Sequence, residues 1–167
     1  ECLDLVAQGV RELVLIGQDL GSYGRDLPVA GGLPVAGGAG ARPMLPELLA
    51  ALSASEGDFR VRTLYIHPDH FPEGILPLMA ADPRLLPYFD MPFQHGSARV
   101  LKAMNRRGSA EGYLELIARI RGALPDAAIR STFLVGFPGE TDEDFGYLRD
   151  FQESARLDWV GSFAYSR

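Results

Sequence analysis

The hydrophobic positions of the chain follow two alternating periods. Short apolar runs rich in β-branched and aromatic residues predict strands, whereas longer segments with apolar residues three or four positions apart predict helices. The predicted strands cover residues 12–17, 61–66, 85–91, 128–137 and 159–165. The predicted helices cover residues 45–55, 72–82, 109–124 and 142–156. Strands and helices therefore alternate along most of the chain.

This alternation predicts the fold class. Strands separated by helices usually lie parallel in one sheet, with the helices packed outside it. We therefore expect an α/β fold, either a parallel sheet or part of a β/α barrel, with ligands at the C-terminal ends of the strands. The helix at 109–124 should bury one stripe of apolar side chains, because they recur near the 3.6-residue helical period. The stripe consists of Leu114, Ile117, Ile120 and Leu124.

One segment interrupts the alternation. Residues 27–38 read LPVAGGLPVAGG, a duplication of six residues, and are followed by AGARP. Glycine, alanine and proline in this proportion cannot build a packed element, so we interpret residues 28–43 as a flexible insertion loop. A slipped repeat explains this loop more simply than a functional lid does.

Composition narrows the class of protein. The 167 residues suffice for one domain, or a large piece of one, and carry a net charge of −6 from 22 acidic and 16 basic side chains. This balance disfavours a general affinity for nucleic acid. No apolar run reaches the roughly 18 residues that span a bilayer, and no secretory signal is present. The single cysteine, Cys2, excludes an internal disulfide, so a reducing, cytoplasmic setting fits best.

Polar side chains gather where the predicted strands end, whereas the helices are plainer. Loops on a rigid scaffold commonly carry binding and catalytic groups. The set comprises Gln18, Asp19, Tyr23, His67, Asp69, His70, Gln94, His95, Ser97, Glu140, Tyr165 and Arg167. This mixture of amides, hydroxyls and a few charges suits a polar, zwitterionic ligand better than a polyanion.

The three histidines raise the alternative of a metal-dependent hydrolase built on a β/α barrel. However, His67 and His70 flank a proline and share no regular helical face, and the chain holds no H-x-H or H-E-x-x-H pattern. A structural role for His67, with His70 and His95 facing a ligand, explains these residues better. The chain also lacks the G-x-S-x-G sequence that would indicate a serine nucleophile.

The stretch FLVGFPGETDED, residues 133–144, predicts a strand, a tight turn and the start of a helix. A phosphate-binding P-loop would need a lysine, which is absent, and the four acids would repel phosphate. Thr141 followed by Asp144 is instead typical of a capping box, so we interpret the four acids as helix-capping groups. Gly136 has no side chain, so a flat group could lie against the strand end at Val135 to Pro138.

Five segments together resemble the radical S-adenosylmethionine (SAM) methylthiotransferases of the MiaB and RimO type. They are residues 9–27 (GVRELVLIGQDLGSYGRDL), 65–72 (YIHPDHFP), 88–109 (YFDMPFQHGSARVLKAMNRRGS), 129–145 (IRSTFLVGFPGETDEDF) and 158–167 (DWVGSFAYSR). Within the family, the GQD, HPDHFP and QHGS sequences resemble the RimO branch more than the tRNA branch. The RimO branch methylthiolates an aspartate of small-subunit ribosomal protein twelve, and the other branch modifies adenosine in tRNA.

The resemblance implies an open, partial β/α barrel of six strands that holds SAM and a [4Fe–4S] cluster. A 5′-deoxyadenosyl radical formed from SAM takes a hydrogen atom from the substrate, and a second [4Fe–4S] cluster belongs to a separate N-terminal domain. The family's CxxxCxxC loop would precede Glu1, so we expect about five of the six strands in residues 1–167 and no activity from this fragment alone. The resemblance also implies a monomer without membrane association, and it leaves the electron donor open.

The resemblance further assigns residues by motif position. The methionine end of SAM would lie at Gln18 and Asp19, its ribose or carboxylate at Gln94, His95 and Ser97, and its adenine at Val135, Gly136, Phe137 and Pro138. Arg130 would pair with the SAM carboxylate, whereas Tyr23, Asp69 and His70 would lie on the substrate side. No ligand role passes to Cys2. Three alternatives stay open: a tRNA adenosine methylthiotransferase, the metal-dependent hydrolase, and a non-catalytic truncated scaffold.

Overall fold

The computed structural model describes residues 1–25 and 43–166 of the chain. The strands are β1 (Glu12–Leu15), β2 (Arg60–Thr63), β3 (Leu85–Asp90), β4 (Ala128–Val135) and β5 (Trp159–Ala164). The helices are α1 (Cys2–Ala7), α2 (Leu45–Ser53), α3 (Ile75–Ala81), α4 (Ala98–Ala103), α5 (Ala110–Ala123) and α6 (Asp142–Ala155). Two 3₁₀ turns, η1 (Leu20–Ser22) and η2 (Pro68–His70), follow β1 and β2.

The predicted pattern of elements is confirmed where the structure describes the chain. All five predicted strands and all four predicted helices form, most of them shorter than expected at one or both ends. The short helices α1 and α4 and the two 3₁₀ turns were not predicted, because three to six residues are too few to show a helical period. The predicted insertion loop at 28–43 lies outside the described residues, apart from Pro43.

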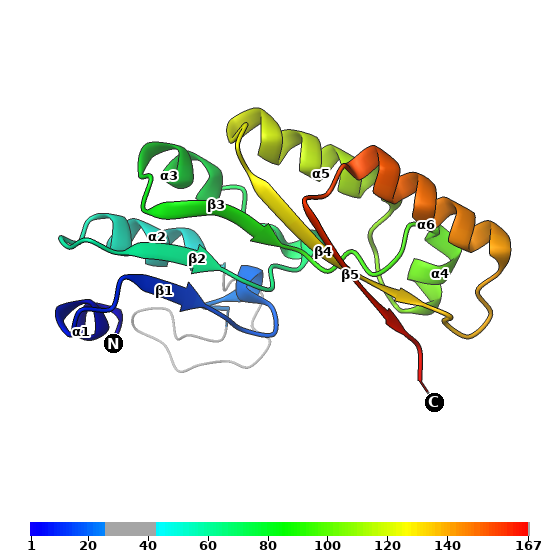
Figure 1. The fold of residues 1–167 in the computed structure, drawn as a ribbon, viewed down its shortest axis with the longest axis horizontal. Helices are drawn as coiled ribbons and strands as arrows, with labels where there is room; N and C mark the ends of the chain where they lie inside the picture. The colour runs from blue at the N-terminus through cyan, green and yellow to red at the C-terminus, as the bar shows by residue number, and fades with distance from the viewer. Residues whose placement is uncertain (26–42, 167) are drawn as a thin grey trace.

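The five strands form one parallel sheet in the order β1-β2-β3-β4-β5. Helices α2 and α3 lie over the β1–β3 part of the sheet, and α5 and α6 run side by side over the β4–β5 part (Figure 1). In β4, Ile129, Ser131 and Phe133 are buried, whereas the alternate residues are half-buried on the opposite face. The predicted α/β fold with a parallel, barrel-like sheet is thus confirmed, and its β4 strand shows one face packed against helices.

The core between sheet and helices is aliphatic and aromatic. Phe151 of α6 packs edge-to-face on Phe93 and Phe133, with ring centroids 5.5 and 6.0 Å apart. Of the stripe predicted for α5, Ile117, Ile120 and Leu124 are buried as expected, whereas Leu114 is only half-buried and Tyr113 and Leu116 are buried as well. The 3.6-residue period gave the correct spacing. However, apolar residues at 113, 114, 116 and 117 allow two neighbouring faces of the helix to be buried, and packing on the sheet decides which one is.

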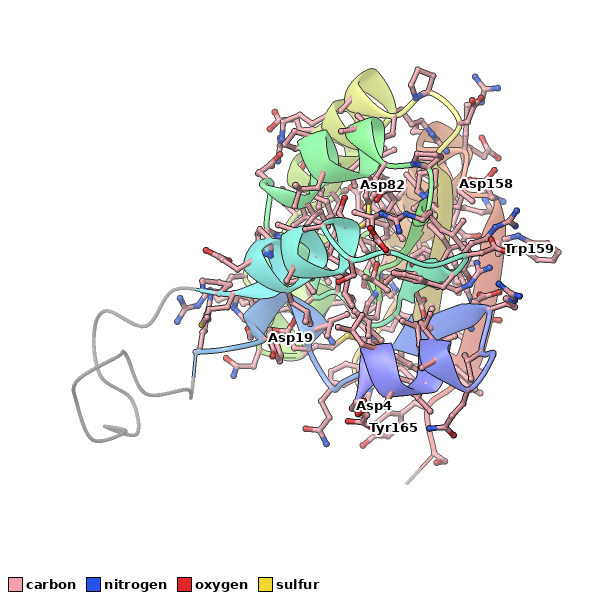
Figure 2. The ribbon with its side chains drawn as sticks, turned by 90° about the vertical axis from the view of Figure 1, so that its left-hand side faces the viewer. Asp4, Asp19, Asp82, Asp158, Trp159 and Tyr165 are labelled. Atoms are coloured by element: carbon pink, nitrogen blue, oxygen red, sulfur yellow. The ribbon has the colours of Figure 1, made fainter. Side chains whose placement is uncertain are left out.

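The face of the sheet without helices carries exposed apolar groups at both edges. On β1 and just after it, Val14 and Ile16 are exposed, and on β5 the side chains of Trp159 and Phe163 are exposed as well. Trp159 stands at the outer edge of the molecule, with an exposed fraction of 67% (Figure 2). Among the described residues, no helix has the length and apolar character needed to cross a membrane. We call this side the helix-free face.

Candidate functional site

The five strands run parallel, so their C-terminal ends meet along one edge of the sheet. Loops that leave such ends are where open α/β folds bind ligands. Two groups of polar side chains occupy this edge, one after β1 and β2 and the other after β3 and β4. We call Asp19, Ser22, His67 and His70 the β1/β2 cluster, and Gln94, His95, Ser97, Glu140 and Asp144 the β3/β4 cluster.

In the β1/β2 cluster, Asp19 joins the two loops. Its Oδ1 accepts the backbone N–H of His67 at 3.1 Å, and its Oδ2 accepts the hydroxyl of Ser22 at 2.6 Å. The Nδ1 of His70 also lies 2.6 Å from Oδ2. Burial alone would raise the pKa of Asp19, but the hydrogen bonds from Ser22, His70 and His67 outweigh it and lower the pKa. The carboxylate is therefore ionised and already has three partners.

His67 and its neighbours complete this cluster. The N–H of Asp69 donates to Nδ1 of His67 at 3.2 Å, and the guanidinium of Arg106 contacts Nε2. Burial lowers the pKa of His67, and the charge of Arg106 lowers it further. His67 is thus a structural histidine, as predicted, whereas Asp69 and His70 are exposed at the rim. The substrate-side role of Asp69 and His70 stays a prediction.

In the β3/β4 cluster, the turn after β3 is tied to β4 by its backbone. Gln94 has a φ of 70°, a left-handed conformation that few residues other than glycine adopt. Its N–H donates to Thr132 O at 3.0 Å, and its carbonyl accepts the N–H of Leu134 at 2.9 Å. This pairing leaves the Gln94 side chain half-buried beside the open end of β4.

His95 and Ser97 lie inside the protein and do not face open space. The His95 side chain is 0% exposed, and its Nδ1 accepts the N–H of Ser97 at 2.9 Å. Its Nε2 has no hydrogen-bond partner among the described residues, and Oε1 of Glu140 lies 3.6 Å away. Of these three side chains, only that of Gln94 is partly exposed, and the predicted roles of all three toward SAM stay predictions.

Ser97 begins α4 and connects it to the start of α6. Its hydroxyl donates to Oδ1 of Asp144 at 2.6 Å, and Arg99 pairs with Oδ2 of the same carboxylate. Thr141 and Asp144 form the predicted capping box at the N-terminus of α6, which is confirmed. The guanidinium of Arg99 and the hydroxyls of Ser97 and Thr141 hold the pKa of Asp144 far below its usual range. These groups fix the two turns to each other.

The turn after β4 presents backbone rather than side chains. Gly136 and Gly139 have φ values of 73° and 85°, and a methyl group placed on Gly136 would meet no atom within 4 Å. Phe137 lies edge-on to Tyr165 from the end of β5, with centroids 5.6 Å apart. The prediction that Glu140 caps the helix is wrong, because its Oε2 instead accepts the N–H of Phe137 at 3.0 Å. The carboxylate closes the turn instead.

Arg130 has a different partner from the predicted one. It is the third residue of β4, and its guanidinium donates to Oδ1 of Asp90 at 2.7 Å. The hydrogen bond to this buried carboxylate raises the pKa of Arg130. A SAM carboxylate would have to share the guanidinium of Arg130 with Asp90. The predicted pairing of Arg130 with SAM therefore stays a prediction, and the ion pair with Asp90 competes with it. Sequence alone gave no sign of Asp90, because the match depends on the β3–β4 register.

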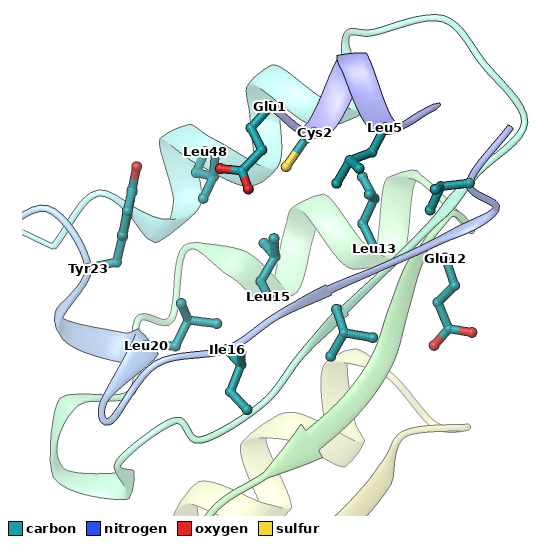
Figure 3. A pocket seen from close by; sticks show the side chains of 12 residues that line it. Glu1, Cys2, Leu5, Glu12, Leu13, Leu15, Ile16, Leu20, Tyr23 and Leu48 are labelled. Carbon is teal, nitrogen blue, oxygen red and sulfur yellow. The ribbon is translucent and has the colours of Figure 1, made fainter. Parts of the chain in front are cut away.

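Gln18 and Tyr23 are sequence neighbours of the β1/β2 cluster, but their side chains do not belong to its hydrogen-bonded group. Gln18 is exposed in the loop after β1, and Tyr23 follows η1 at one end of a groove of about 450 Å³. The groove runs between α1, α2 and β1, and the thiol of Cys2 and the side chain of Leu48 line it (Figure 3). The predicted contact of Gln18 with SAM and the substrate-side role of Tyr23 therefore rest on the resemblance alone.

The residues present do not suit an iron–sulfur cluster or a catalytic metal. Within residues 1–25 and 43–166, no three His, Cys, Asp or Glu side chains are placed to hold a metal ion. Cys2 is a half-buried free thiol. His95, one of the three histidines of the hydrolase alternative, is enclosed beside Glu140, so that alternative finds no metal site here.

Sequence reasoning missed three residues that organise this edge. Ser22 and Arg106 join the β1/β2 cluster, and Arg99 joins the capping box. Ser22 lies three residues after Asp19, a spacing that could have suggested a local hydrogen bond. The contacts of Arg99 and Arg106 reach across the fold, by 45 and 39 residues respectively, and no local pattern predicts them.

The sequence profile of the radical SAM superfamily matches residues 4–151. Proteins named ribosomal protein uS12 methylthiotransferase RimO are similar along nearly the whole chain. The one from Pseudothermotoga lettingae is 46% identical over 97% of this chain and 35% of its own length. Those from Treponema denticola and Geobacter sulfurreducens are 49% and 43% identical over 93% and 100% of this chain, and over 34% and 35% of their own lengths. The chain thus spans about a third of these relatives.

Among solved structures, the fold is similar to that of coproporphyrinogen III oxidase (HemN) from Escherichia coli, which is described as a radical SAM enzyme. The TM-score is 0.57 at 18% identity, over 72% of this chain and 27% of the other. This likeness agrees with the parallel sheet described above and concerns the fold alone.

Proposed function

The chain belongs to the radical SAM superfamily, and on this premise we propose that its full-length protein is a methylthiotransferase that modifies an aspartate of ribosomal protein uS12. The similarity to RimO proteins, at 40–49% identity over at least 93% of this chain, supports the substrate. The open β3/β4 edge supports SAM as the cofactor. The observation that carries the proposal is that the RimO protein of Geobacter sulfurreducens matches this chain along its full length, which includes all the strand-end turns described here.

SAM fits the edge formed by the β3 and β4 turns. Gly136 offers an open backbone surface on which a planar adenine could lie, with Phe137 and Pro138 beside it. Gln94 would hold the ribose or carboxylate with its amide group. Gln18 and Asp19 would contact the methionine end of SAM. The amide of Gln18 is exposed and available for this contact, whereas the carboxylate of Asp19 already accepts hydrogen bonds within the protein. His95 and Ser97 would support the turn from beneath.

When bound with a reduced [4Fe–4S] cluster, SAM supplies the radical that removes hydrogen from the substrate carbon. The residues of this chain bind and orient SAM and keep water from the reacting atoms. Exposed apolar side chains on the helix-free face, such as Val14 and Phe163, would exclude water from the space above the sheet once ligand and substrate cover them. We place the two cluster sites in parts of the protein outside residues 1–167, and the protein in the cytoplasm as a monomer. The electron donor and sulfur source stay open.

The test uses the full-length protein with both clusters reconstituted. It is incubated with SAM, a reductant, a sulfide source and uS12, and the tryptic peptides of uS12 are read by mass spectrometry. We expect one aspartate to gain a methylthio group in place of a hydrogen. Methylthioadenosine in co-incubated tRNA, with uS12 unmodified, would favour the tRNA branch of the family. If neither a methylthiolated product nor 5′-deoxyadenosine forms, the result would favour the non-catalytic scaffold.

A further inference from the structure

We propose that His95 is a positioning residue for SAM, acting through Glu140 on the turn after β4. This inference rests on the proposed function and concerns a side chain that does not touch the ligand. The buried imidazole belongs to the turn after β3, and the carboxylate belongs to the turn after β4. Their contact connects the two turns that would hold opposite parts of SAM.

The protonation of His95 follows from its neighbour. The backbone N–H of Ser97 points at Nδ1 from 2.9 Å, and a nitrogen that accepts a hydrogen bond cannot itself carry a proton. The imidazolium form, which is protonated at both nitrogens, is excluded for the same reason. The ring is therefore neutral, and its single proton is on Nε2.

The carboxylate of Glu140 lies near this Nε2–H. The ring is fully buried, and within the described residues Nε2 has no partner at hydrogen-bond distance. Oε1 of Glu140 lies 3.6 Å away, a few tenths of an ångström beyond a good N–H···O contact. Buried donors are costly when unpaired, so a small inward movement of the carboxylate is favoured. A ligand that presses the two turns together would close this gap.

Glu140 connects His95 to the backbone of the turn after β4 through two hydrogen bonds with Phe137. Its Oε2 accepts the N–H of Phe137 at 3.0 Å, and its own N–H donates to the Phe137 carbonyl at 2.8 Å. The peptide that joins Gly136 to Phe137 is thereby held from one side. Gly136 has no side chain to restrict it, so this carboxylate is the group that decides how the peptide faces an adenine.

Two substitutions of His95 separate the two nitrogens. His95→Asn keeps an oxygen near the position of Nδ1, so the Ser97 N–H still has an acceptor, but no donor reaches Glu140. His95→Gln places an amide N–H near the position of Nε2 and loses the acceptor for Ser97. Both variants remove the ring, and the loss of packing is therefore similar.

The experiment measures SAM affinity by equilibrium dialysis on the full-length, cluster-loaded protein. We expect His95→Asn to raise Kd about tenfold and His95→Gln to stay within about threefold of the wild type, since misplaced supporting groups commonly cost this much. Glu140→Gln, which turns an amide N–H toward His95 or Phe137, should also raise Kd and provides a second variant if His95→Asn fails to fold. Urea unfolding of each variant reports on folding itself.

A second measurement decides the hydrogen bond independently of activity. Long-range ¹⁵N–¹H spectra of the protein with oxidised clusters should give the Nε2–H pattern for His95, with the Nε2 proton moving downfield when SAM binds. A protonated Nδ1, or equal Kd values for the Asn and Gln variants, would overturn the proposal. If the wild type fails to bind SAM at all, the proposed function fails, and the positioning role fails with it. Wild-type SAM binding with equal variants rejects the positioning role alone.

Discussion

The two polar clusters at the strand ends differ in how completely their groups are paired. In the β1/β2 cluster, the carboxylate of Asp19 already has three partners, and the cluster lies near the surface. In the β3/β4 cluster, the side chains are mostly buried, and Nε2 of His95 lacks a partner within the described part of the chain. The hydrogen bonds of the first cluster connect the loops after β1 and β2 and leave the Asp19 carboxylate fully paired. The second retains an unpaired donor, Nε2 of His95, 3.6 Å from the carboxylate of Glu140.

This difference teaches that polar richness alone does not identify the ligand side of a site. The β1/β2 loops have the more conspicuous sequence, since they contain Asp19, Asp69 and the two histidines His67 and His70. Yet these groups mostly satisfy one another. The β3/β4 turns carry fewer charges at their open surface, and backbone dominates there, which is what an adenine edge requires. This contrast is why the main SAM contacts are proposed for the β3/β4 edge.

The largest expected effect comes from filling Gly96, which lies against the backbone of α6. A methyl group there would come within 2.6 Å of the Tyr147 carbonyl oxygen and 2.9 Å of Leu148 Cα. Because a helix backbone cannot yield cheaply, Gly96→Ala should lower the free energy of unfolding by about 3 kcal/mol. Urea unfolding measures this change.

The matched control is Gly122→Ala in α5, where a methyl group would meet no atom within 4 Å. Alanine favours helix over glycine, so this variant should gain up to about 1 kcal/mol. Equal effects at Gly96 and Gly122 would mean that the turn after β3 does not lie on α6 as described.

The next effect separates the clusters by pH. The pKa values of Asp144 and Asp19 are both lowered on folding, so each carboxylate stabilises the fold above its unfolded pKa of about 4. That stabilisation is lost as the pH falls through the folded pKa. The pKa of Asp144 is lowered further, so the stability difference between wild type and Asp144→Asn should be full near pH 6, should begin to shrink below about pH 4, and should continue to shrink below pH 3.

Asp19→Asn should show the same trend with a smaller change, because burial opposes the hydrogen bonds to that carboxylate. Denaturant unfolding at several pH values gives both curves. A stability difference for Asp144→Asn that does not vary with pH would show that its carboxylate is not held by Arg99 and the two hydroxyls.

The smallest effect concerns a second unpaired group, which belongs to α5 and not to the proposed adenine turn. Tyr113 of α5 is 3% exposed, and its hydroxyl has no hydrogen-bond partner among the described residues. Burial raises the pKa of this phenol to about 12. Tyr113→Phe removes an unsatisfied polar group, so stability should stay the same or rise by about 1 kcal/mol. SAM affinity should not change.

Thermal unfolding and SAM dialysis measure both quantities for Tyr113→Phe. A clear loss of stability would reveal a partner for the hydroxyl. A loss of SAM affinity would show that unpaired buried groups anywhere in the fold matter equally, which would remove the distinction drawn for His95.

Sequence patterns predicted the elements well because their periods are local. Five strands, four helices and the capping box of Thr141 and Asp144 follow from spacing over a few residues. The partners and the burial of individual side chains depend instead on strand register and on packing between distant segments. Arg130 meets Asp90 only because β3 and β4 pair at that position, and His95 is enclosed only because α6 covers its turn. No pattern within one segment contains that information.

The location of the adenine is the central claim, and photo-crosslinking tests it most directly. The full-length, cluster-loaded protein is irradiated with 8-azido-SAM, digested with trypsin and examined by mass spectrometry. The turns after β2 and β4 separate cleanly, because residues 63–84 form one tryptic peptide and residues 131–149 form another. We predict SAM-competable label on 131–149, within Val135 to Pro138. Label on 63–84, with none on 131–149, would contradict the assignment of the adenine to the β3/β4 edge.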